Sequence, residues 1–204
     1  MHDTTDATAA KKAIRANVRA LRAQITPAER AAKSAIICDR LWRFVDAHRT
    51  PPHIVGVYSA FAEEVDLHDF ITRCYGAGIQ VAFPCMDLKT NLTQPMYMRE
   101  VAETDYTQGK APFITKPLAR FAPEAEDLRA FPVVAPEAIN LLVTPLVAFD
   151  DANKRLGYGG GNYDRYLPLL APGTPVFGAA FAEQRIDHIP CEAHDKPLDI
   201  VVWA

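Results

Sequence analysis

Residues 141–165 of this 204-residue chain read LLVTPLVAFDDANKRLGYGGGNYDR, an apolar run followed by a cluster of glycines. The run at 141–147 is typical of a central strand that is covered on both faces of a parallel sheet. Four of the ten glycines fall within positions 157–161. A helix is predicted from 162 to about 170. A buried strand that leads into a glycine-rich loop and then a helix indicates an α/β fold.

The rest of the chain repeats this alternation of helices and strands. Apolar residues at helical spacing predict a first helix, through Ile14, Val18, Leu21 and Ile25. The pattern predicts two more helices, over 27–48 and 67–76, and strands over 54–59, 79–83, 96–98, 176–181 and 198–203. Residues 101–137 contain scattered prolines and read as a long surface excursion. The predicted class is therefore α/β with a mainly parallel sheet.

Two local signals mark the ends of predicted elements. Thr26, Pro27 and Glu29 have the spacing of a capping box with proline at the first helical position, so they predict the start of the second helix. Pro84 directly follows the strand predicted at 79–83 and is expected to stop it.

The composition is that of an ordinary globular protein. Hydrophobic residues make up 49% and charged residues 23%, which excludes disorder as a description of the whole chain. The net charge of -3 gives no global reason to expect nucleic-acid binding. No run approaches the length of a membrane span, so no membrane association is expected. The length favours a single domain over 1–204, with 1–10 flexible.

The cysteines indicate the cellular compartment. Cys38, Cys74, Cys85 and Cys191 are far apart and form no C-x-x-C pair, whereas a zinc site or a dithiol motif would need closer spacing. We therefore expect reduced thiols and a cytoplasmic location. The polar N-terminus has no apolar segment of the kind that signal peptides carry.

The glycine cluster lies where open α/β sheets bind ligands, beyond the carboxyl end of a central strand. Glycines let backbone N–H groups approach an anion, and a following helix offers its positive end. Lys154 and Arg155 could pair with phosphate, and Asp164 could hold magnesium. The spacing matches neither a Walker loop nor a dinucleotide fingerprint. A flexible turn is the alternative, but four glycines between Arg155 and Asp164 favour phosphate binding.

The first predicted helix carries a basic stripe of Lys11, Arg15, Arg19 and Arg22. Taken alone, such a stripe is typical of a solvated helix face.

The stretch RLGYGGGNYD at 155–164 resembles the signature of the 5-formyltetrahydrofolate cyclo-ligases, also called 5,10-methenyltetrahydrofolate synthetases. The likeness extends over nearly the whole chain. KKAIR at 11–15 is similar to the family's first ATP-contacting segment, and Tyr58 with EVD at 64–66 resembles its folate-contacting strand and loop. TPLVAFD at 144–150 resembles the strand before its glycine loop, and HDKPLD at 194–199 its carboxy-terminal aspartate motif. Leu67 and Asn162 depart from the family pattern.

This resemblance implies a three-layer α/β sandwich similar to that of sugar-phosphate isomerases and CoA transferases. It also implies ATP- and magnesium-dependent closure of 5-formyltetrahydrofolate to 5,10-methenyltetrahydrofolate, with release of ADP and phosphate. In the implied scheme the formyl oxygen attacks the γ-phosphate, the folate N10 attacks the phosphorylated iminium, and phosphate leaves. This chemistry needs positioning and charge neutralisation rather than a protein nucleophile. The expected partner is a small-molecule folate, and the expected state is a monomer.

The resemblance also assigns site residues by matching positions. It implies ATP binding by the cations Lys11, Arg15 and Arg155 and by the loop residues Leu156, Gly157, Tyr158, Gly159, Gly160, Gly161, Asn162 and Tyr163. It implies folate binding by Tyr58, Glu64 and Tyr163, and magnesium binding by Asp164 and Asp195. Arg19 and Arg22 are expected to stay surface charges.

Alternatives remain for several of these residues. Tyr58 fits a buried position in the sheet as well as it fits the folate pocket. Glu64 is also readable as a helix-entry cap, and Glu63 and Asp66 are its rivals for the folate site. Asp195 is also readable as part of a surface turn, and Asp199 is its rival for the metal. For the whole chain, the alternatives are a sugar-phosphate isomerase-like enzyme and a catalytically silent nucleotide-binding protein on the same fold.

Overall fold

A computed structural model describes residues 3–47, 52–88, 96–122, 124–190 and 197–204. Within these ranges eight strands form one sheet in the order β10-β9-β6-β1-β2-β3-β5, and β4 pairs with β2. The strands are β1 (Ile54–Gly56), β2 (Gln80–Asp87), β3 (Met96–Val101), β4 (Arg120–Phe121), β5 (Val133–Val134), β6 (Leu141–Pro145), β9 (Val176–Ala180) and β10 (Ile200–Trp203). Pairs among β10, β9, β6, β1 and β2 are parallel, and both pairs of β3 are antiparallel. The predicted α/β class with a mainly parallel sheet is confirmed.

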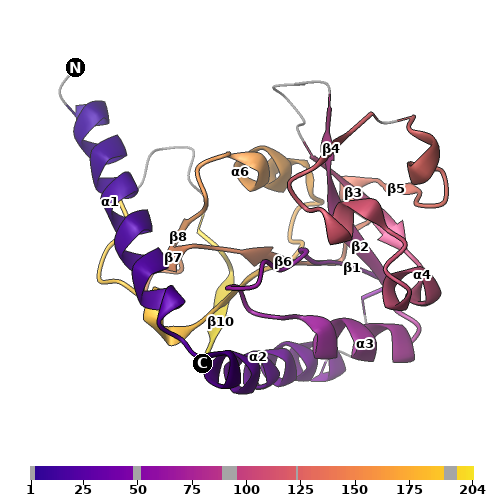
Figure 1. Ribbon diagram of the computed structural model, residues 1–204, viewed down its shortest axis with the longest axis horizontal. Coiled ribbons are helices and arrows are strands. Elements are labelled where there is room, and N and C mark those ends of the chain that lie inside the picture. Colours follow the sequence, from indigo (N-terminus) through magenta and orange to yellow (C-terminus); the bar gives the residue numbers. More distant parts are fainter. Residues whose placement is uncertain (1–2, 48–51, 89–95, 123, 191–196) are drawn as a thin grey trace.

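Helices cover both faces of this sheet. The α-helices are α1 (Asp3–Ala23), α2 (Pro27–Ala47), α3 (His68–Gly76), α4 (Glu103–Thr107), α5 (Pro112–Thr115) and α6 (Asn162–Tyr166). Short 3₁₀ turns are η1 (Glu126–Leu128), η2 (Pro136–Ala138), η3 (Leu167–Leu169) and η4 (Ala182–Gln184). Figure 1 shows α2 and α3 on one face of the sheet and α6 on the other. No helix among the described residues is long and apolar enough to cross a membrane.

The strand predicted from the apolar run lies in the middle of the sheet. β6 pairs with β1 on one side and with β9 on the other, and its residues 141–144 are buried. It ends at Pro145 rather than at 147, because the next residues form a separate hairpin. That hairpin pairs β7 (Ala148–Phe149) with β8 (Arg155–Leu156), and the sequence pattern did not predict it.

Asp150 shapes the turn of this hairpin. Its Oδ1 accepts hydrogen bonds from the backbone N–H of Ala152 at 3.0 Å and of Lys154 at 3.1 Å, while Oδ2 accepts from Ile189 N at 3.1 Å. A buried carboxylate that is satisfied by several N–H groups fixes a turn firmly. The glycine loop therefore starts from β8, and Arg155 in β8 stands at its base.

The predicted start of the second helix is confirmed. The backbone N–H of Thr26 donates to Glu29 Oε2 at 2.9 Å, and the Glu29 N–H donates to Thr26 Oγ1 at 3.3 Å. Pro27 is the first residue of α2. These reciprocal bonds satisfy N–H groups that a helix end leaves without intrahelical partners.

The expectation that Pro84 stops the second strand is wrong. β2 continues to Asp87, and Pro84 pairs with Met98 of β3. Pairing with β1 ends at Ala82 and pairing with β4 begins at Met86, so on that side no residue in the described part of the chain is a ladder partner of Pro84. Proline is tolerated where one side of a strand needs no N–H donor.

The segment 101–137 packs against the core more than a surface excursion would. It contains the short elements α4, α5, β4, η1 and β5 and enters η2, and its Phe113 and Phe131 are buried with ring centroids 5.3 Å apart. The buried Arg99 of β3 donates to the Phe131 carbonyl at 2.7 Å. Val133, by contrast, is 51% exposed. The excursion is thus anchored to the core at both aromatic rings.

Helix α1 packs through a small cluster of its own. Val18 lies in it with Val147, Ala148, Leu156 and Ile189, and Ile14 packs against it. Figure 1 shows α1 along one side of the molecule, beside β7 and β8. This packing places the N-terminal helix next to the hairpin that leads into the glycine loop. α1 begins at Asp3, within the stretch for which flexibility was expected.

Candidate active site

One cavity of about 610 Å³ gathers the predicted site residues. It is lined by cations of α1, by side chains of the segment after β1, and by the whole stretch 155–164. The predicted residues among its lining are Lys11, Arg15, Tyr58, Glu64, Arg155, Leu156, Gly157, Tyr158, Gly159, Gly160, Gly161, Asn162, Tyr163 and Asp164. Asp195 lies outside the described residues. Segments more than a hundred residues apart in sequence therefore meet at one site.

The glycine loop has a backbone that requires glycine at two positions. Gly159 has φ of 98° and Gly161 has φ of 63°, both in the left-handed region that L side chains rarely adopt. A Cβ on Gly161 would lie 2.9 Å from Arg165 Nη1. Arg165 Nη2 also donates to the Gly160 carbonyl at 2.6 Å. The loop is thus bent at fixed points and is held by the first turn of α6.

Arg15 reaches this loop from α1. Its Nε donates to the Gly157 carbonyl at 2.8 Å, and a Cβ on Gly159 would lie 3.6 Å from its guanidinium carbon. Lys11, one turn earlier on the helix, lines the same cavity. The basic stripe is therefore split: Lys11 and Arg15 face the cavity, and Arg19 is exposed.

Arg155 and Asp164 form an ion pair at the two ends of the loop. Arg155 Nη2 lies 2.5 Å from Asp164 Oδ1, and the two side chains are 5% and 34% exposed. The Arg155 Nε has no hydrogen-bond partner within the described residues. A buried guanidinium with an unused donor is suited to an anionic ligand in the adjoining cavity.

Glu64 is the carboxylate of the 60–66 segment that lines the cavity. It is 5% exposed; Oε1 accepts from the Tyr158 hydroxyl and Oε2 from the Phe61 N–H at 2.9 Å. Burial raises the pKa of Glu64, while these two hydrogen bonds act in the opposite direction. Asp66 instead binds the backbone at the start of α3, where its Oδ1 accepts from the His68 N–H at 2.9 Å.

The two tyrosines predicted for the folate pocket, Tyr58 and Tyr163, line the cavity, and their hydroxyl groups are buried. The Tyr58 hydroxyl donates to the Val65 carbonyl at 2.9 Å, so Tyr58 is both a buried residue after β1 and a cavity wall. The Tyr163 hydroxyl is buried and has no hydrogen-bond partner within the described chain. Burial raises the pKa of both tyrosines, so both hydroxyls stay neutral donors.

Two other polar residues that the sequence singled out lie elsewhere. Asp199 Oδ2 accepts from the Val176 N–H at 2.7 Å, at the start of β9. The cavity lies instead near Pro145, at the end of the neighbouring parallel strand β6. Asp199 therefore has a structural role near the amino end of β9, whereas the cavity lies at the carboxyl end of the parallel strand β6. Lys154 is not among the residues that line the cavity.

The expectation that Arg22 is a surface charge is wrong. Arg22 is 2% exposed, its Nη2 lies 3.4 Å from Glu63 Oε2, and its guanidinium carbon lies 5.7 Å from the centre of the Tyr158 ring. The sequence held a signal for this burial, since Arg22 follows Val18 by four positions and precedes Ile25 by three. Both of these residues are buried, so helical spacing places Arg22 on the apolar face.

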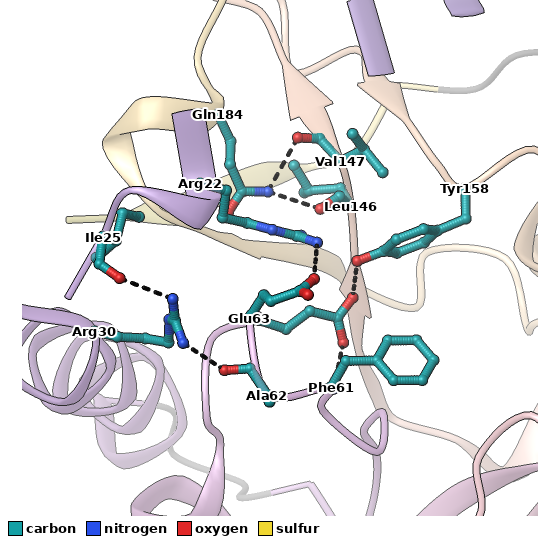
Figure 2. Close-up of polar contacts among 11 residues, drawn as sticks. Arg22, Ile25, Arg30, Phe61, Ala62, Glu63, Leu146, Val147, Tyr158 and Gln184 are labelled. Carbon is teal, nitrogen blue, oxygen red and sulfur yellow. Dashed lines mark hydrogen bonds and ion pairs between the residues drawn. The ribbon is translucent and has the colours of Figure 1, made fainter. Parts of the chain in front are cut away.

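The segment that carries Glu63 and Glu64 is held from two helices (Figure 2). Arg22 of α1 binds Glu63, and Arg30 of α2 donates to the Ala62 carbonyl at 2.7 Å. Arg30 also donates to the Ile25 carbonyl at 2.9 Å, which ties the turn between α1 and α2 to the same guanidinium. These contacts fix the segment against the cavity.

The described residues contain no cluster of three or more His, Cys, Asp or Glu side chains that could hold a metal by protein ligands alone. Magnesium bound with phosphates typically uses one or two carboxylates and does not need such a cluster.

Comparison with known proteins identifies the family. The model of the 5-formyltetrahydrofolate cyclo-ligase family matches residues 7–204. The chain belongs to this family. The cyclo-ligase of Escherichia coli K12 is 30% identical over 151 residues, which are 74% of this chain and 77% of that protein. The Haemophilus influenzae cyclo-ligase is 26% identical over 195 residues, 94% of this chain and 97% of that protein.

Solved structures with the same fold carry the family's other name. A 5,10-methenyltetrahydrofolate synthetase from Mycoplasma pneumoniae superposes with a TM-score of 0.72 at 21% identity, over 94% of this chain and 97% of that one. The corresponding synthetase of Aquifex aeolicus gives 0.68 at 23% identity, over 95% and 89%. The resemblance inferred from the glycine-loop signature is confirmed, and so is the expectation of an enzyme of the cyclo-ligase type.

Proposed function

We propose that this cyclo-ligase family member converts 5-formyltetrahydrofolate to 5,10-methenyltetrahydrofolate in a reaction that consumes ATP, requires magnesium and releases ADP and phosphate. The observation that carries the proposal is the shared cavity. Its lining combines a cationic part, Lys11, Arg15 and Arg155 with the glycine loop, and a second set of residues, Glu64, Tyr58 and Tyr163. A nucleotide and a pterin could therefore be held side by side by residues of this chain.

The cationic part of the cavity suits a triphosphate. Charge-assisted hydrogen bonds from guanidinium and ammonium groups are the strong contacts to phosphate oxygens. The unused Nε of Arg155 is one such donor. Catalysis of phosphoryl transfer depends on positioning and charge stabilisation rather than on covalent bonds between the protein and the substrate. In this proposal Lys11, Arg15 and Arg155 hold the phosphates, and the loop 156–163 surrounds them.

The other part of the cavity suits the folate. A carboxylate can accept hydrogen bonds from the N–H groups of a pterin, and the neutral Tyr163 hydroxyl has a donor to offer. Glu64, Tyr58 and Tyr163 would orient the ring so that the formyl oxygen attacks the γ-phosphate. The folate N10 then attacks the phosphorylated iminium, and phosphate leaves. Orientation of this kind converts a bimolecular encounter into an effectively intramolecular step.

Asp164 fits a magnesium ligand with one constraint. Its Oδ1 already binds Arg155, so a cation at this carboxylate would contact Oδ2 or compete with the guanidinium. Asp195 is the proposed second ligand. When bound, magnesium neutralises phosphate charge and fixes the geometry of the triphosphate.

No protein nucleophile enters the proposal. Cys38, Cys74 and Cys85 are buried, and burial raises the pKa of the Cys38 thiol to about 11 and of the Cys74 thiol to about 12. Buried neutral thiols of this kind are inert. The proposal further places the enzyme in the cytoplasm, in line with the wide spacing of its four cysteines, and takes it to be a monomer.

One assay tests the function. The protein is mixed with 5-formyltetrahydrofolate, magnesium and ATP, and the product is followed by its absorbance, with parallel reactions that lack ATP or magnesium. Product should form only in the complete mixture. A protein that binds ATP without forming product would be a silent nucleotide-binding protein. ATP-independent turnover of a sugar phosphate would indicate an isomerase-like enzyme.

A further inference from the structure

Arg22 is the largest of the fully buried side chains, and it does not line the cavity. Its Nη2 contacts Glu63 at 3.4 Å, and its Nε and Nη1 have no hydrogen-bond partner within the described residues. Removing a guanidinium from water is costly, and an incompletely paired one contributes little to stability. The position of Arg22 therefore calls for an explanation other than stability.

Its neighbours connect it to the cavity. The guanidinium carbon lies 5.7 Å from the ring centre of Tyr158, within the range of a cation–π contact. The Tyr158 hydroxyl donates to Glu64 Oε1. Figure 2 shows Arg22 reaching toward Glu63 and the hydroxyl end of Tyr158. A continuous set of contacts thus runs from α1 through the glycine loop to the carboxylate after β1.

We propose that Arg22 is a positioning residue of the folate site, which holds the Tyr158 hydroxyl against Glu64 and places a positive charge beside that carboxylate. This inference rests on the proposed function, because it takes Glu64 as the group that binds the pterin. Arg22 itself touches neither substrate.

The charges around Glu64 give Arg22 a defined effect. Burial raises the pKa of Glu64, whereas the Tyr158 and Phe61 hydrogen bonds and the Arg22 charge lower it. Glu63 also raises it. The other titratable groups that interact with Glu64 are the tyrosines 58, 158 and 163, whose pKa values are raised by burial. The cations Lys11, Arg15 and Arg155 line the same cavity. Arg22 is the cation that acts on Glu64 most directly, so its loss should make the carboxylate take up a proton at higher pH.

The test is the affinity for 5-formyltetrahydrofolate, without ATP, from weakly acidic to weakly alkaline pH. The carboxylate form of Glu64 binds the pterin, so affinity should fall as the pH drops through its pKa. In Arg22→Met this fall should begin at a higher pH, so that binding at a fixed pH within the fall is weaker than in the wild type. Arg22→Lys keeps the charge and should restore most of the wild-type profile. Arg19→Met removes an exposed arginine of the same helix and should match the wild type.

Tyr158→Phe provides an independent variant if Arg22→Met does not fold, as judged by circular dichroism. It keeps the ring beneath the guanidinium, removes the donor to Glu64, and should shift the profile in the same direction.

Two failures are distinguishable. The proposed function of this site would be overturned if the wild type did not bind 5-formyltetrahydrofolate. It would also be overturned if Glu64→Gln bound this folate as tightly as the wild type. A wild type that binds, with Glu64→Gln impaired and folded Arg22→Met or Tyr158→Phe showing the wild-type profile, would overturn the role of Arg22.

Discussion

The side chains of Arg155 and Asp164 meet at 2.5 Å and join the two ends of the glycine loop. Arg155 is 5% exposed in this pair, so water screens its charge less than it would on the surface. The loop between them is therefore closed at its base by its own side chains. The same carboxylate is the proposed magnesium ligand, which makes Asp164 the most informative residue to change.

Asp164→Asn should suppress turnover by at least tenfold, and raising the magnesium concentration should recover part of the loss, because an amide is a weaker ligand than a carboxylate. Turnover against magnesium at saturating ATP and folate measures this. Asp151→Asn is the matched control, since Asp151 is an exposed aspartate paired with Arg185. Asp195→Asn should resemble Asp164→Asn in milder form. Wild-type turnover with an unchanged magnesium curve in Asp164→Asn would remove this residue from the metal site.

Lys11→Ala and Arg15→Ala should raise the Michaelis constant for ATP more than that for folate. Loss of a charge-assisted hydrogen bond costs about 1.5–3 kcal/mol, or roughly tenfold to a hundredfold in binding. Arg15→Ala should have the larger effect, because it also removes the bond to the Gly157 carbonyl. Lys12→Ala, at an exposed position of the same helix, is the control. An unchanged Michaelis constant for ATP in folded variants would show that Lys11 and Arg15 do not bind the nucleotide.

Glu64→Gln should weaken folate binding while ATP binding stays close to wild type. The variant keeps the volume but replaces one acceptor oxygen with a donor amide, so it conflicts with pterin N–H groups. Direct binding of each ligand by calorimetry separates the two effects. Asp66→Asn is the comparison, because Asp66 accepts from the His68 N–H at the start of α3 and does not line the cavity. The opposite pattern, with Asp66→Asn impaired in folate binding and Glu64→Gln silent, would show that the wrong carboxylate was assigned.

The stability of the protein should carry a pH signature of Glu64. Burial raises the pKa of this carboxyl above its ordinary value of 4.5. Its contribution to stability is therefore fully present below the ordinary value and is lost as the pH rises through the folded-state pKa. Relative to Glu64→Gln, which cannot titrate, the wild type should lose free energy of unfolding from acidic to neutral pH. Urea denaturation at several pH values measures the difference, and a pH-independent difference would contradict the raised pKa.

Gly161→Ala should reduce both stability and ATP affinity. The left-handed φ of 63° costs an alanine about 1 kcal/mol, and its Cβ would lie 2.9 Å from Arg165 Nη1. Gly173→Ala also has a left-handed φ, of 84°, but its Cβ meets nothing within 4 Å. Thermal unfolding should therefore show a loss of stability in both variants, while the Michaelis constant for ATP should rise only in Gly161→Ala. Equal ATP constants in the two variants would mean that the shape of the loop does not matter for the nucleotide.

The sequence was sufficient for the parts of the fold that follow periodic patterns. The apolar run at 141–147 predicted the central strand, which the structure ends at Pro145, and the Thr26–Glu29 box predicted the start of α2, because each depends on neighbouring residues. The strand end predicted from Pro84 was wrong, since the cost of a missing N–H depends on which side of the strand is paired. The β7–β8 hairpin was missed because two-residue strands show no alternation.

In the candidate site, too, local sequence predicted the contiguous features but not those that depend on tertiary packing. The glycine loop and its flanking charges are contiguous in sequence and could be recognised there. Arg22 was grouped with its basic stripe, although its helical spacing from Val18 and Ile25 places it on the apolar face. The choice of Glu64 over Asp66 likewise depends on the direction of each side chain. Only the folded chain settles that direction.

The small cluster that holds α1 has a consequence for local opening of the protein. Val18 packs there with a few buried side chains, whereas the central strands lie inside much larger clusters. Backbone amides of α1 should therefore exchange with deuterium through partial opening, sooner than those of β6. A ligand held by both Arg15 and the glycine loop would bind only the docked helix. Its binding energy would then appear as slower exchange throughout α1, far beyond the residues that it contacts.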